Sequence, residues 1–256
     1  MKLPCRLALL ALTCLAGVVS AQELRLVTAP LPPFTLDSPG PKGAMVDVVQ
    51  AICTKAGLRC RLEVMPWRRA WSMIDAGSAD GIFSILNLPE REARLQMSDD
   101  IVESHYALFG PTGIPFNYSG PSSLAGYTIG AYAPSGAYDI LKAWLQDIPE
   151  VRLVPELDNL TVLKKLNDGG RYGSKGLGFA NLDVGQYYIV HNKLNNIAPV
   201  FEVKTIRYCV GLSRKTVSPE LAASFNSVLR DLQKSGQLAR LLAPYSLKPA
   251  AARAGS

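Results

Sequence analysis

The sequence predicts an α/β protein built of two lobes, with a ligand cleft between them. Strand and helix patterns alternate from residue 24 to residue 84, and the same alternation starts again after residue 122. A late strand and a long helix then remain to complete the first lobe. Parallel strands joined by helices form doubly wound sheets, which bind ligands at the carboxyl ends of their strands. We therefore expect each lobe to be a doubly wound sheet with flanking helices.

Local signals place the elements of both lobes. The prolines of residues 30–34 force an extended loop after the first strand, and Gly57 and Gly77 follow helical patterns as C-terminal glycines do. The elements expected in the first lobe are strands at residues 24–28, 59–64 and 79–84 and helices at 46–56 and 69–76. The elements expected in the second lobe are strands at residues 127–132, 151–155 and 177–180 and helices at 137–146 and 159–168.

The final elements predict that the chain crosses twice between the lobes. They are a strand at residues 205–213 and an amphipathic helix at 219–243 that Gly236 interrupts. The predicted organisation is a signal peptide at residues 1–21, a first lobe of 22–110 and 207–247, a second lobe of 111–206, and a disordered tail at 248–256.

The first residues have the three parts of a secretory signal. Lys2 and Arg6 precede the apolar stretch 7–19, and small residues lead to a cleavage site after Ala21. Cys14 allows a lipoprotein reading, but the residues before it lack the usual small-residue approach. We therefore expect cleavage and a free protein in the periplasm.

Charge and histidine content exclude several function classes. The formal net charge of +6 falls to about +4 without the leader, and the basic residues form no run, so nucleic-acid binding is not expected. His105 and His191 stand far apart and without carboxylate spacing, which predicts no metal site. No motif indicates a cofactor, and no nucleophile motif accompanies either histidine.

Three cysteines remain after cleavage. Export places Cys53 and Cys60 in a compartment where disulfides persist, and the short turn between them could bring them together. We expect that bond, and we expect Cys209 to be a buried strand residue.

Taken together, the motifs and their spacing resemble the family 3 extracellular solute-binding proteins that serve polar amino acid uptake. The resemblance runs from Leu24 to Tyr245, and the Cys53 and Cys60 spacing is also found in that family. It implies the two-lobed type II periplasmic-binding-protein fold. The residues that carry it are Pro33-Phe34, Gly43 with Asp47, Pro66-Trp67, Gly77 with Asp80-Gly81, Glu90-Arg91, Leu124-Ala125-Gly126, Asp158-Asn159, Gly170-Arg171, and Gly236 before Tyr245.

The resemblance also implies ligand-binding residues in the first lobe. Arg91 matches an arginine whose planar guanidinium holds the ligand carboxylate through paired hydrogen bonds. Ser84 matches a serine that meets the ligand. Trp67 matches a position that lines the ligand face, although packing in the core would explain a tryptophan there equally well. Phe34 is expected in the ligand site as well.

In the second lobe, the resemblance implies fewer and looser matches. Ser135 stands at a predicted helix start, where free backbone N–H groups can bind an anion, but it can equally be a plain N-cap. Asn181 and Asp183 both lie near the place where relatives present an aspartate to the ligand's ammonium group, and the sequence does not decide between them.

Departures from the family pattern predict a less polar cleft. Leu31 replaces a stacking aromatic residue, Leu86 a serine and Leu88 a threonine, and Thr28 stands where an aspartate can serve basic side chains. The glycine-rich segment 168–176 lacks a phosphate-binding pattern and is expected to be a flexible connection.

The function that the resemblance implies is binding of a small polar solute, such as an amino acid or another carboxylate, by hinge closure. The expected protein is a monomer and not an enzyme, and its partner is an ABC transporter permease. Two alternatives remain. One is a sensor that reports to a membrane receptor. The other is an enzyme on the same fold that resembles cyclohexadienyl dehydratase, with Glu63, Glu90 and Glu156 as candidate acids, although none is expected to face Arg91.

Overall fold

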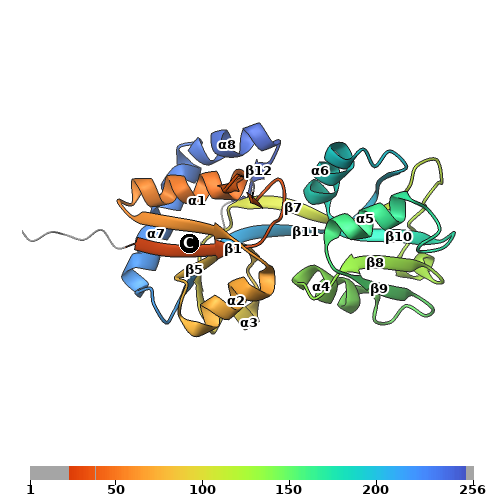
Figure 1. Ribbon diagram of the computed structural model, residues 1–256, viewed down its shortest axis with the longest axis horizontal. Coiled ribbons are helices and arrows are strands. Elements are labelled where there is room, and N and C mark those ends of the chain that lie inside the picture. The colour runs from red at the N-terminus through yellow and green to blue at the C-terminus, as the bar shows by residue number, and fades with distance from the viewer. Residues whose placement is uncertain (1–22, 38, 252–256) are drawn as a thin grey trace, which may run out of the picture.

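The computed structural model describes residues 23–37 and 39–251. The predicted signal peptide and residues 252–256 of the predicted tail lie outside the described residues. Two lobes follow each other along the long axis of the molecule and are joined by two long strands (Figure 1). Each lobe combines parallel strands with helices on both faces, which confirms the predicted fold class.

The first lobe contains a parallel sheet in the order β4-β1-β5. Its strands are β1 (Glu23–Thr28), β4 (Arg59–Val64) and β5 (Gly81–Leu86). The helices on one face are α1 (Ala44–Lys55), α7 (Pro219–Lys234) and α8 (Gln237–Leu242), and those on the other are α2 (Trp67–Ala76) and α3 (Pro89–Glu92). The short strands are β2 (Leu36–Asp37), β3 (Pro41–Lys42) and β6 (Leu95–Met97).

The second lobe repeats this plan with the parallel order β10-β8-β9. Its strands are β8 (Thr128–Tyr132), β9 (Arg152–Glu156) and β10 (Gly176–Asn181), and its helices are α4 (Gly136–Leu145), α5 (Asn159–Asn167) and α6 (Leu182–Asn192). A 3₁₀ turn at Pro121–Leu124 precedes β8. Ser135, Asp158 and Asn181 each begin a helix by accepting a backbone N–H, so the helices start where the strands end.

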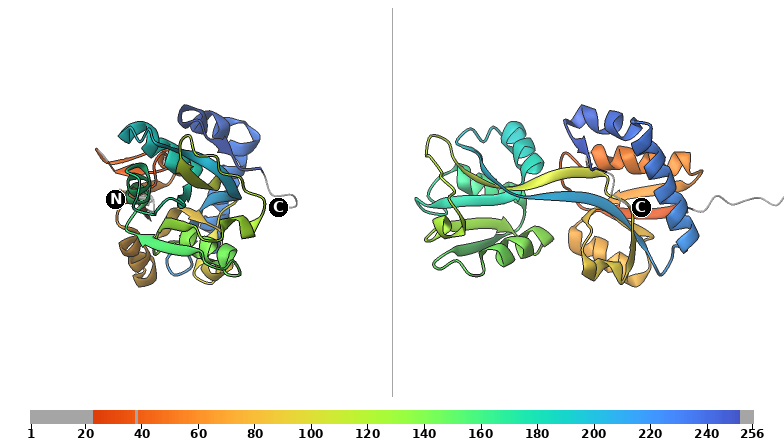
Figure 2. Two further views of the ribbon diagram at one scale, coloured as in Figure 1. Left: turned by 90° about the vertical axis from the view of Figure 1, so that its right-hand side faces the viewer. Right: turned by 180° about the vertical axis from the view of Figure 1, so that it is seen from behind.

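Two antiparallel strands, β7 (Val102–Pro111) and β11 (Ile197–Ser213), run through both lobes. β11 pairs with β5 in the first lobe, and β7 pairs with β10 in the second. One continuous sheet therefore connects the lobes in the order β4-β1-β5-β11-β7-β10-β8-β9. Figure 2 shows the two strands side by side between the lobes.

The structure differs from the predicted elements mainly at these crossing strands. β7 was not predicted, and β11 begins eight residues before the expected strand at 205–213. Register shifts near Pro199 and Glu202 break the period-two alternation that would have revealed its first half. Both predicted lobe limits, after residue 110 and before residue 207, consequently fall inside a strand. The final helix ends at Lys234, and α8 follows Gly236.

The predicted disordered tail begins too early. Lys248–Pro249 forms β12, which pairs with β7 opposite Val102 and Glu103. Ala250 is buried, and its N–H donates to the carbonyl of Ile101 at 3.0 Å. A composition of proline and alanine does suggest disorder, but the free edge of β7 supplies the hydrogen bonds that order these residues.

The predicted disulfide is confirmed. Cys53 in the last turn of α1 is bonded to Cys60 in β4. The bond fixes the helix to the edge strand of the first lobe. Cys209 is fully buried in β11, as expected.

Close packing of α6 against β7 depends on Gly185. A Cβ atom at this position would lie 2.1 Å from Cζ of the fully buried ring of Phe109. We predict that Gly185→Ala lowers the free energy of unfolding by about 1–3 kcal/mol, because the overpacked ring must move. Urea unfolding measures the change. Gln186→Ala, at the next and exposed position of the same helix, is the control and should change stability by less than about 0.5 kcal/mol. Equal stability of the two variants would contradict this packing.

Candidate functional site

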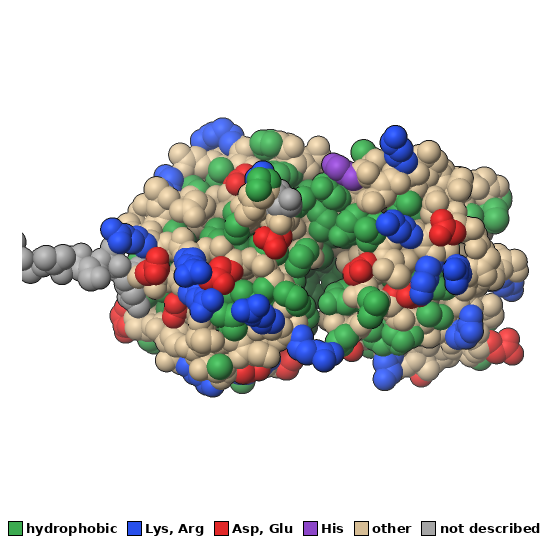
Figure 3. Space-filling view, in the orientation of Figure 1, with side chains coloured by type: hydrophobic (Ala, Val, Ile, Leu, Met, Phe, Trp, Pro, Cys, Tyr) green, Lys and Arg blue, Asp and Glu red, His purple; other side chains and the backbone are tan. Residues whose placement is uncertain are grey.

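A cavity of about 450 Å³ lies between the lobes, at the carboxyl ends of the parallel strands. Figure 3 shows the hollow on the face of the molecule where the lobes meet. Its volume lies within the range of small-molecule sites. Residues that line it from the first lobe include Thr28, Leu31, Trp67, Ser84, Leu86 and Arg91. Residues that line it from the second lobe include Tyr132, Ser135, Gly136, Asp158, Asn181 and Tyr188. We call this space the inner cavity.

Arg91 brings a buried positive charge to the inner cavity. Its side chain extends from α3, the residue is only 8% exposed, and its Nη1 donates to the carbonyl oxygen of Leu86 at 2.8 Å. Among the described residues, no carboxylate lies within ion-pair distance of it. Burial lowers the pKa of Arg91, since a charge is costly away from water. The site thus holds a cation for which the described part of the chain provides no counter-ion.

The start of α4 brings the second lobe close to Arg91. A Cβ atom on Gly136 would lie 3.5 Å from the Nη2 atom of Arg91. The guanidinium of Arg91 also lies 5.3 Å from the ring centre of Trp71, which supports it from the first lobe. Arg91 therefore lies at the boundary between the two lobes.

Ser84 lines the same cavity, but its hydroxyl is buried beneath the cavity surface. It is 5% exposed, and its Oγ has no hydrogen-bond partner among the described residues. Its φ of 60° is left-handed, at a register shift between β5 and β11. Ser84 is therefore the extra residue of a bulge, and such bulges re-aim a side chain. Both neighbouring carbonyls are occupied: Thr28 donates to that of Phe83 at 2.8 Å, and the Cys209 thiol donates to that of Ile85 at 3.3 Å.

Trp67 lines the cavity and packs in the lobe at the same time. Its ring lies edge-on to Trp71 at 5.7 Å, within a small apolar cluster around Ile74 and Ile82. Trp67 therefore packs in the lobe and also reaches the cavity, and its contact with a ligand stays a prediction.

Ser135 has the geometry of an N-cap. Its Oγ accepts the N–H of Tyr138 at 3.1 Å and donates to the carbonyl of Tyr132 at 2.7 Å. The residue lines the inner cavity, but its hydroxyl hydrogen is already used within the protein.

Asn181 and Asp183 lie in different surroundings. Asn181 lines the cavity and is 3% exposed, whereas Asp183 does not line it. The Nδ2 of Asn181 donates to Ser104 at 2.8 Å and to the Tyr208 hydroxyl at 3.2 Å, and its Oδ1 accepts from Val184 at 3.0 Å. Both N–H groups of this amide are thus used within the protein.

Asp183 binds the hydroxyl of Ser104, away from the cavity. Burial raises the pKa of this carboxyl, while the bond from Ser104 opposes that shift. Of the two alternatives that the sequence left open, only Asn181 reaches the cavity.

Phe34 does not join the other predicted site residues. The structure buries its ring completely, packed edge-on against Tyr208 at 5.0 Å, and Phe34 does not line the inner cavity. The prolines before it turn the side chain inward. Its neighbour Leu31 lines the cavity instead.

Tyrosines at the inner cavity were missed by sequence reasoning. Tyr106 on β7 and Tyr208 on β11 lie at its base, with their hydroxyls hydrogen-bonded to each other. Burial raises the pKa of both phenols, so both stay protonated. Tyr132 and Tyr188 line the second-lobe side. Tyr106 lies on β7 and Tyr188 lies on α6, and neither element was predicted. The positions of these two tyrosines therefore could not be inferred from the sequence.

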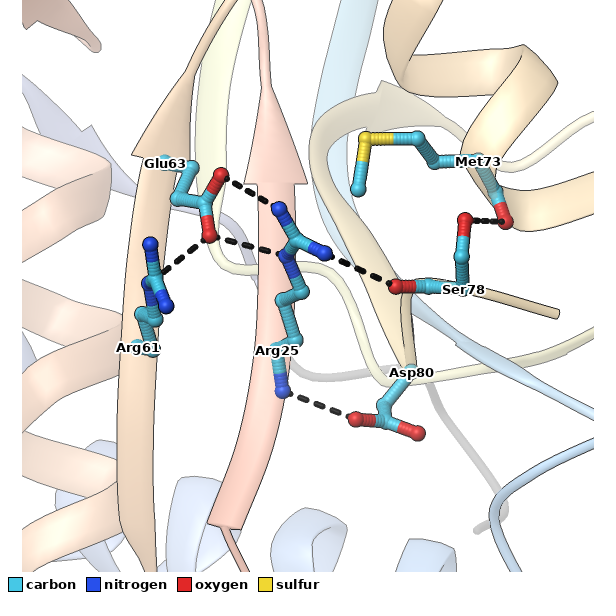
Figure 4. Close-up of polar contacts among 6 residues, drawn as sticks. All are labelled: Arg25, Arg61, Glu63, Met73, Ser78 and Asp80. Atoms are coloured by element: carbon cyan, nitrogen blue, oxygen red, sulfur yellow. Dashed lines mark hydrogen bonds and ion pairs between the residues drawn. The ribbon is translucent and has the colours of Figure 1, made fainter.

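The glutamates considered as catalytic acids lie outside the inner cavity. Figure 4 shows Glu63 between Arg25 and Arg61, and the Arg25 hydrogen bond lowers the pKa of Glu63, which keeps it ionised. In the same cluster, the backbone N–H of Arg25 donates to the carboxylate of Asp80 at 2.8 Å. These contacts stabilise the sheet of the first lobe.

Neither of the other two glutamates takes a place in the inner cavity. Glu156 is buried, bonded to Lys165 at 2.5 Å and to the Tyr172 hydroxyl at 3.0 Å. Glu90 lines only a wider, open recess of about 900 Å³, which continues from Arg91 between α2 and α4. We call this space the outer recess.

Other classes of site receive no support within residues 23–37 and 39–251. No group of three metal-binding side chains occurs there. None of the helices described is both long enough and apolar enough to cross a membrane.

The sequence matches the bacterial extracellular solute-binding proteins, family 3, over residues 24–248. The chain belongs to this family. No curated protein matches the chain in sequence. The family assignment agrees with the resemblance that the sequence motifs suggested.

Solved structures share the fold of this family 3 protein at low sequence identity. A histidine kinase sensor domain with similarity to periplasmic binding proteins has a TM-score of 0.77 and 20% identity, covering 90% of this chain and 99% of that one. An ancestral arginine-binding protein bound to arginine has a TM-score of 0.74 and 19% identity, covering 87% and 97%. The amino acid ABC transporter substrate-binding protein AbpA from Streptococcus pneumoniae, bound to L-arginine, has a TM-score of 0.71 and 20% identity, covering 87% and 94%.

The unpaired hydroxyl of Ser84 predicts an unusual effect on stability. Ser84→Ala removes a buried group that no described residue satisfies, so we expect the unliganded protein to gain up to about 1 kcal/mol in free energy of unfolding. Thr28→Val is the matched control, because it removes a buried hydroxyl that does have a partner. It should lose about 1 kcal/mol. Chemical denaturation measures both, and a loss in Ser84→Ala as large as in Thr28→Val would show that Ser84 is already satisfied.

Proposed function

We propose that this protein captures a small solute carrying a carboxylate or similar anionic group, holds it between its lobes, and delivers it to a membrane transporter. The observation that supports this most is the buried, unpaired guanidinium of Arg91 in a cavity between the lobes. An unpaired buried charge is costly, and an anionic ligand offsets that cost with two parallel hydrogen bonds. Ser84, whose buried hydroxyl has no partner among the described residues, lines the cavity on the same lobe.

Capture depends on the difference in ligand affinity between the open and closed states. A ligand shifts a conformational equilibrium only if it binds one state more tightly than the other. Both lobes line the inner cavity, so a ligand there gains contacts on closure that the open state lacks. β7 and β11 connect the lobes and form the hinge about which they close.

The site of action follows from the predicted leader and from the family. A cleavable signal and the disulfide between Cys53 and Cys60 both suit a periplasmic protein. Proteins that share this fold include a substrate-binding protein of an amino acid ABC transporter. We propose delivery to an ABC transporter by a monomer that performs no chemistry on its solute.

A sensor is the second candidate function. The favouring observation is that a histidine kinase sensor domain shares the fold over 99% of its length. Sensing and transport use the same capture step and differ only in the membrane partner. Permease and ATPase genes beside this gene would favour transport, whereas a neighbouring signalling gene would favour sensing.

Replacement of Arg91 tests the capture step. A ligand at one hundred times its Kd stabilises a protein by about 2.7 kcal/mol, so a thermal-shift panel of amino acids and small organic acids should reveal binders. We expect Arg91→Met to abolish the shift and Arg91→Lys to restore little of it, because an ammonium cannot form the paired hydrogen bonds.

Arg94→Met is the matched control for Arg91. Arg94 also lies over Trp71, at 4.8 Å, but it pairs with Asp75 at 2.6 Å and lines only the outer recess. Ligand affinity should therefore remain in Arg94→Met. An unchanged affinity in Arg91→Met would contradict the role of Arg91, and consumption of prephenate by the purified protein would favour the enzyme alternative.

A further inference from the structure

Apolar side chains of the first lobe lie around Arg91. Leu31 and Leu86 line the inner cavity, and Leu88 lines the outer recess. A Cβ atom on Gly136 would lie 4.0 Å from Cδ1 of Leu86 and 3.9 Å from Cδ1 of Leu88, so these two leucines also meet the start of α4. The space next to the charge is therefore apolar where the two lobes approach each other.

Polar side chains at the base of the inner cavity and on its first-lobe wall already bind other groups of the protein. Thr28 donates its hydroxyl to a backbone carbonyl at 2.8 Å. Both N–H groups of Asn181 are used, and the hydroxyls of Tyr106 and Tyr208 bond to each other. A polar group of a solute that reached this part of the cavity would lose its hydrogen bonds to water and gain few in return. An apolar group would meet no such cost.

The inner cavity and the outer recess meet at an opening that we call the passage. Pro66 and Trp67 of the first lobe line both spaces, and so do Tyr132 and Leu157 of the second lobe. Arg91 also lines both spaces. A solute whose anionic group is bound at Arg91 therefore has its next atoms at or near the passage.

Leu157 is an exposed apolar residue in the passage. It lies between β9 and the N-cap of α5 at Asp158, it is 84% exposed, and it joins none of the apolar clusters among the described residues. An apolar residue before an N-cap often packs against the fourth residue of the helix, here Val162, but Val162 is fully buried and Leu157 is not. Ile114 and Val190, the other large apolar residues that are exposed in the described chain, line neither space. Leu157 thus has no packing role within the protein that would explain it.

We propose that the solute carries an apolar group beside its anionic group, and that Leu157 binds this apolar group in the passage together with Trp67. This inference rests on the proposed function and extends it from the charge of the solute to its polarity. Leu157 and Trp67 belong to different lobes, so an apolar group between them removes apolar surface of both lobes from water. A polar group at the same place would leave Leu157 exposed or would itself lose water.

Two pairs of acids with matched shapes test the polarity of the solute. L-Leucine and L-asparagine differ in an isopropyl group against a carboxamide group, and 4-methylpentanoate and succinamate differ in the same way but lack the ammonium group. Calorimetry should show that, in every pair that binds, the isopropyl acid binds about 10-fold or more tightly than the carboxamide acid. A carboxamide acid that binds as tightly as its partner contradicts the inference, and so does the absence of binding by both isopropyl acids.

Replacement of Leu157 tests its part in this preference. Leu157→Asn should lower the affinity of the isopropyl acids about 5- to 10-fold and leave that of the carboxamide acids unchanged. Leu157→Met keeps an apolar side chain and should keep most of the affinity. Val190→Asn is the matched control, because Val190 is 73% exposed on α6 but lines neither space, and it should bind as the wild type does. Because both residues are exposed, thermal unfolding without ligand should remain the same in all three variants.

The results that overturn the inference differ from those that overturn the proposed function. If the preference for the isopropyl acids persists in full in Leu157→Asn, or if Val190→Asn reduces it equally, Leu157 does not bind the solute. Binding of the isopropyl acids that survives Arg91→Met contradicts the proposed function instead. Loss of binding in Arg91→Met, with equal affinities for both members of a pair in the wild type, would overturn the inference alone.

Discussion

The antiparallel pairing of β7 with β11 is the constraint on which the rest of the molecule depends. These strands are the central pair of the sheet, and each lobe adds its own parallel strands to one side of them. Without this pair, β5 in the first lobe and β10 in the second would each lack a neighbouring strand. Because the two strands also carry register shifts, they can bend where the ladder is already interrupted, which suits a hinge.

The same strands form the base of the cavity, and their polar groups are satisfied. Tyr106 and Tyr208 bond to each other, and Asn181 joins Tyr208 to Ser104. These bonds connect both crossing strands to the start of α6. The walls differ, because the Ser84 hydroxyl lacks a partner and Arg91 lacks a counter-ion among the described residues. This contrast separates groups that hold the cavity in shape from the Arg91 guanidinium, whose charge the described residues leave unbalanced.

The sequence predicted most of the fold because its signals are local. Gly57, Gly77 and Gly236 do mark helix ends, and the order of strands and helices required two doubly wound units. The crossing strands were harder, since the bulges of β11 disturb its alternation. α6 was missed because Gly185, a poor helix former, is required there by Phe109, a residue distant in sequence.

The candidate site was predictable only in part, for a related reason. Ser84 lies in β5 and Arg91 follows that strand, and both line the inner cavity, although their contact with a ligand stays a prediction. Asp183 and Phe34 lie close in sequence to residues that line the cavity, but side-chain direction sends them elsewhere. That direction depends on a buried serine in one case and on a proline turn in the other. Spacing along the chain contains neither piece of information.

The position of Arg91 at the boundary between the lobes has a consequence for how closure is controlled. If a carboxylate of the second lobe paired with Arg91, the protein would satisfy this charge by itself, and closure would not require a solute. A ligand can drive closure only by the difference in its affinity for the two states. A buried guanidinium without an ion-pair partner among the described residues leaves that difference to the solute. The cost of this one unpaired charge is therefore what makes closure depend on the ligand.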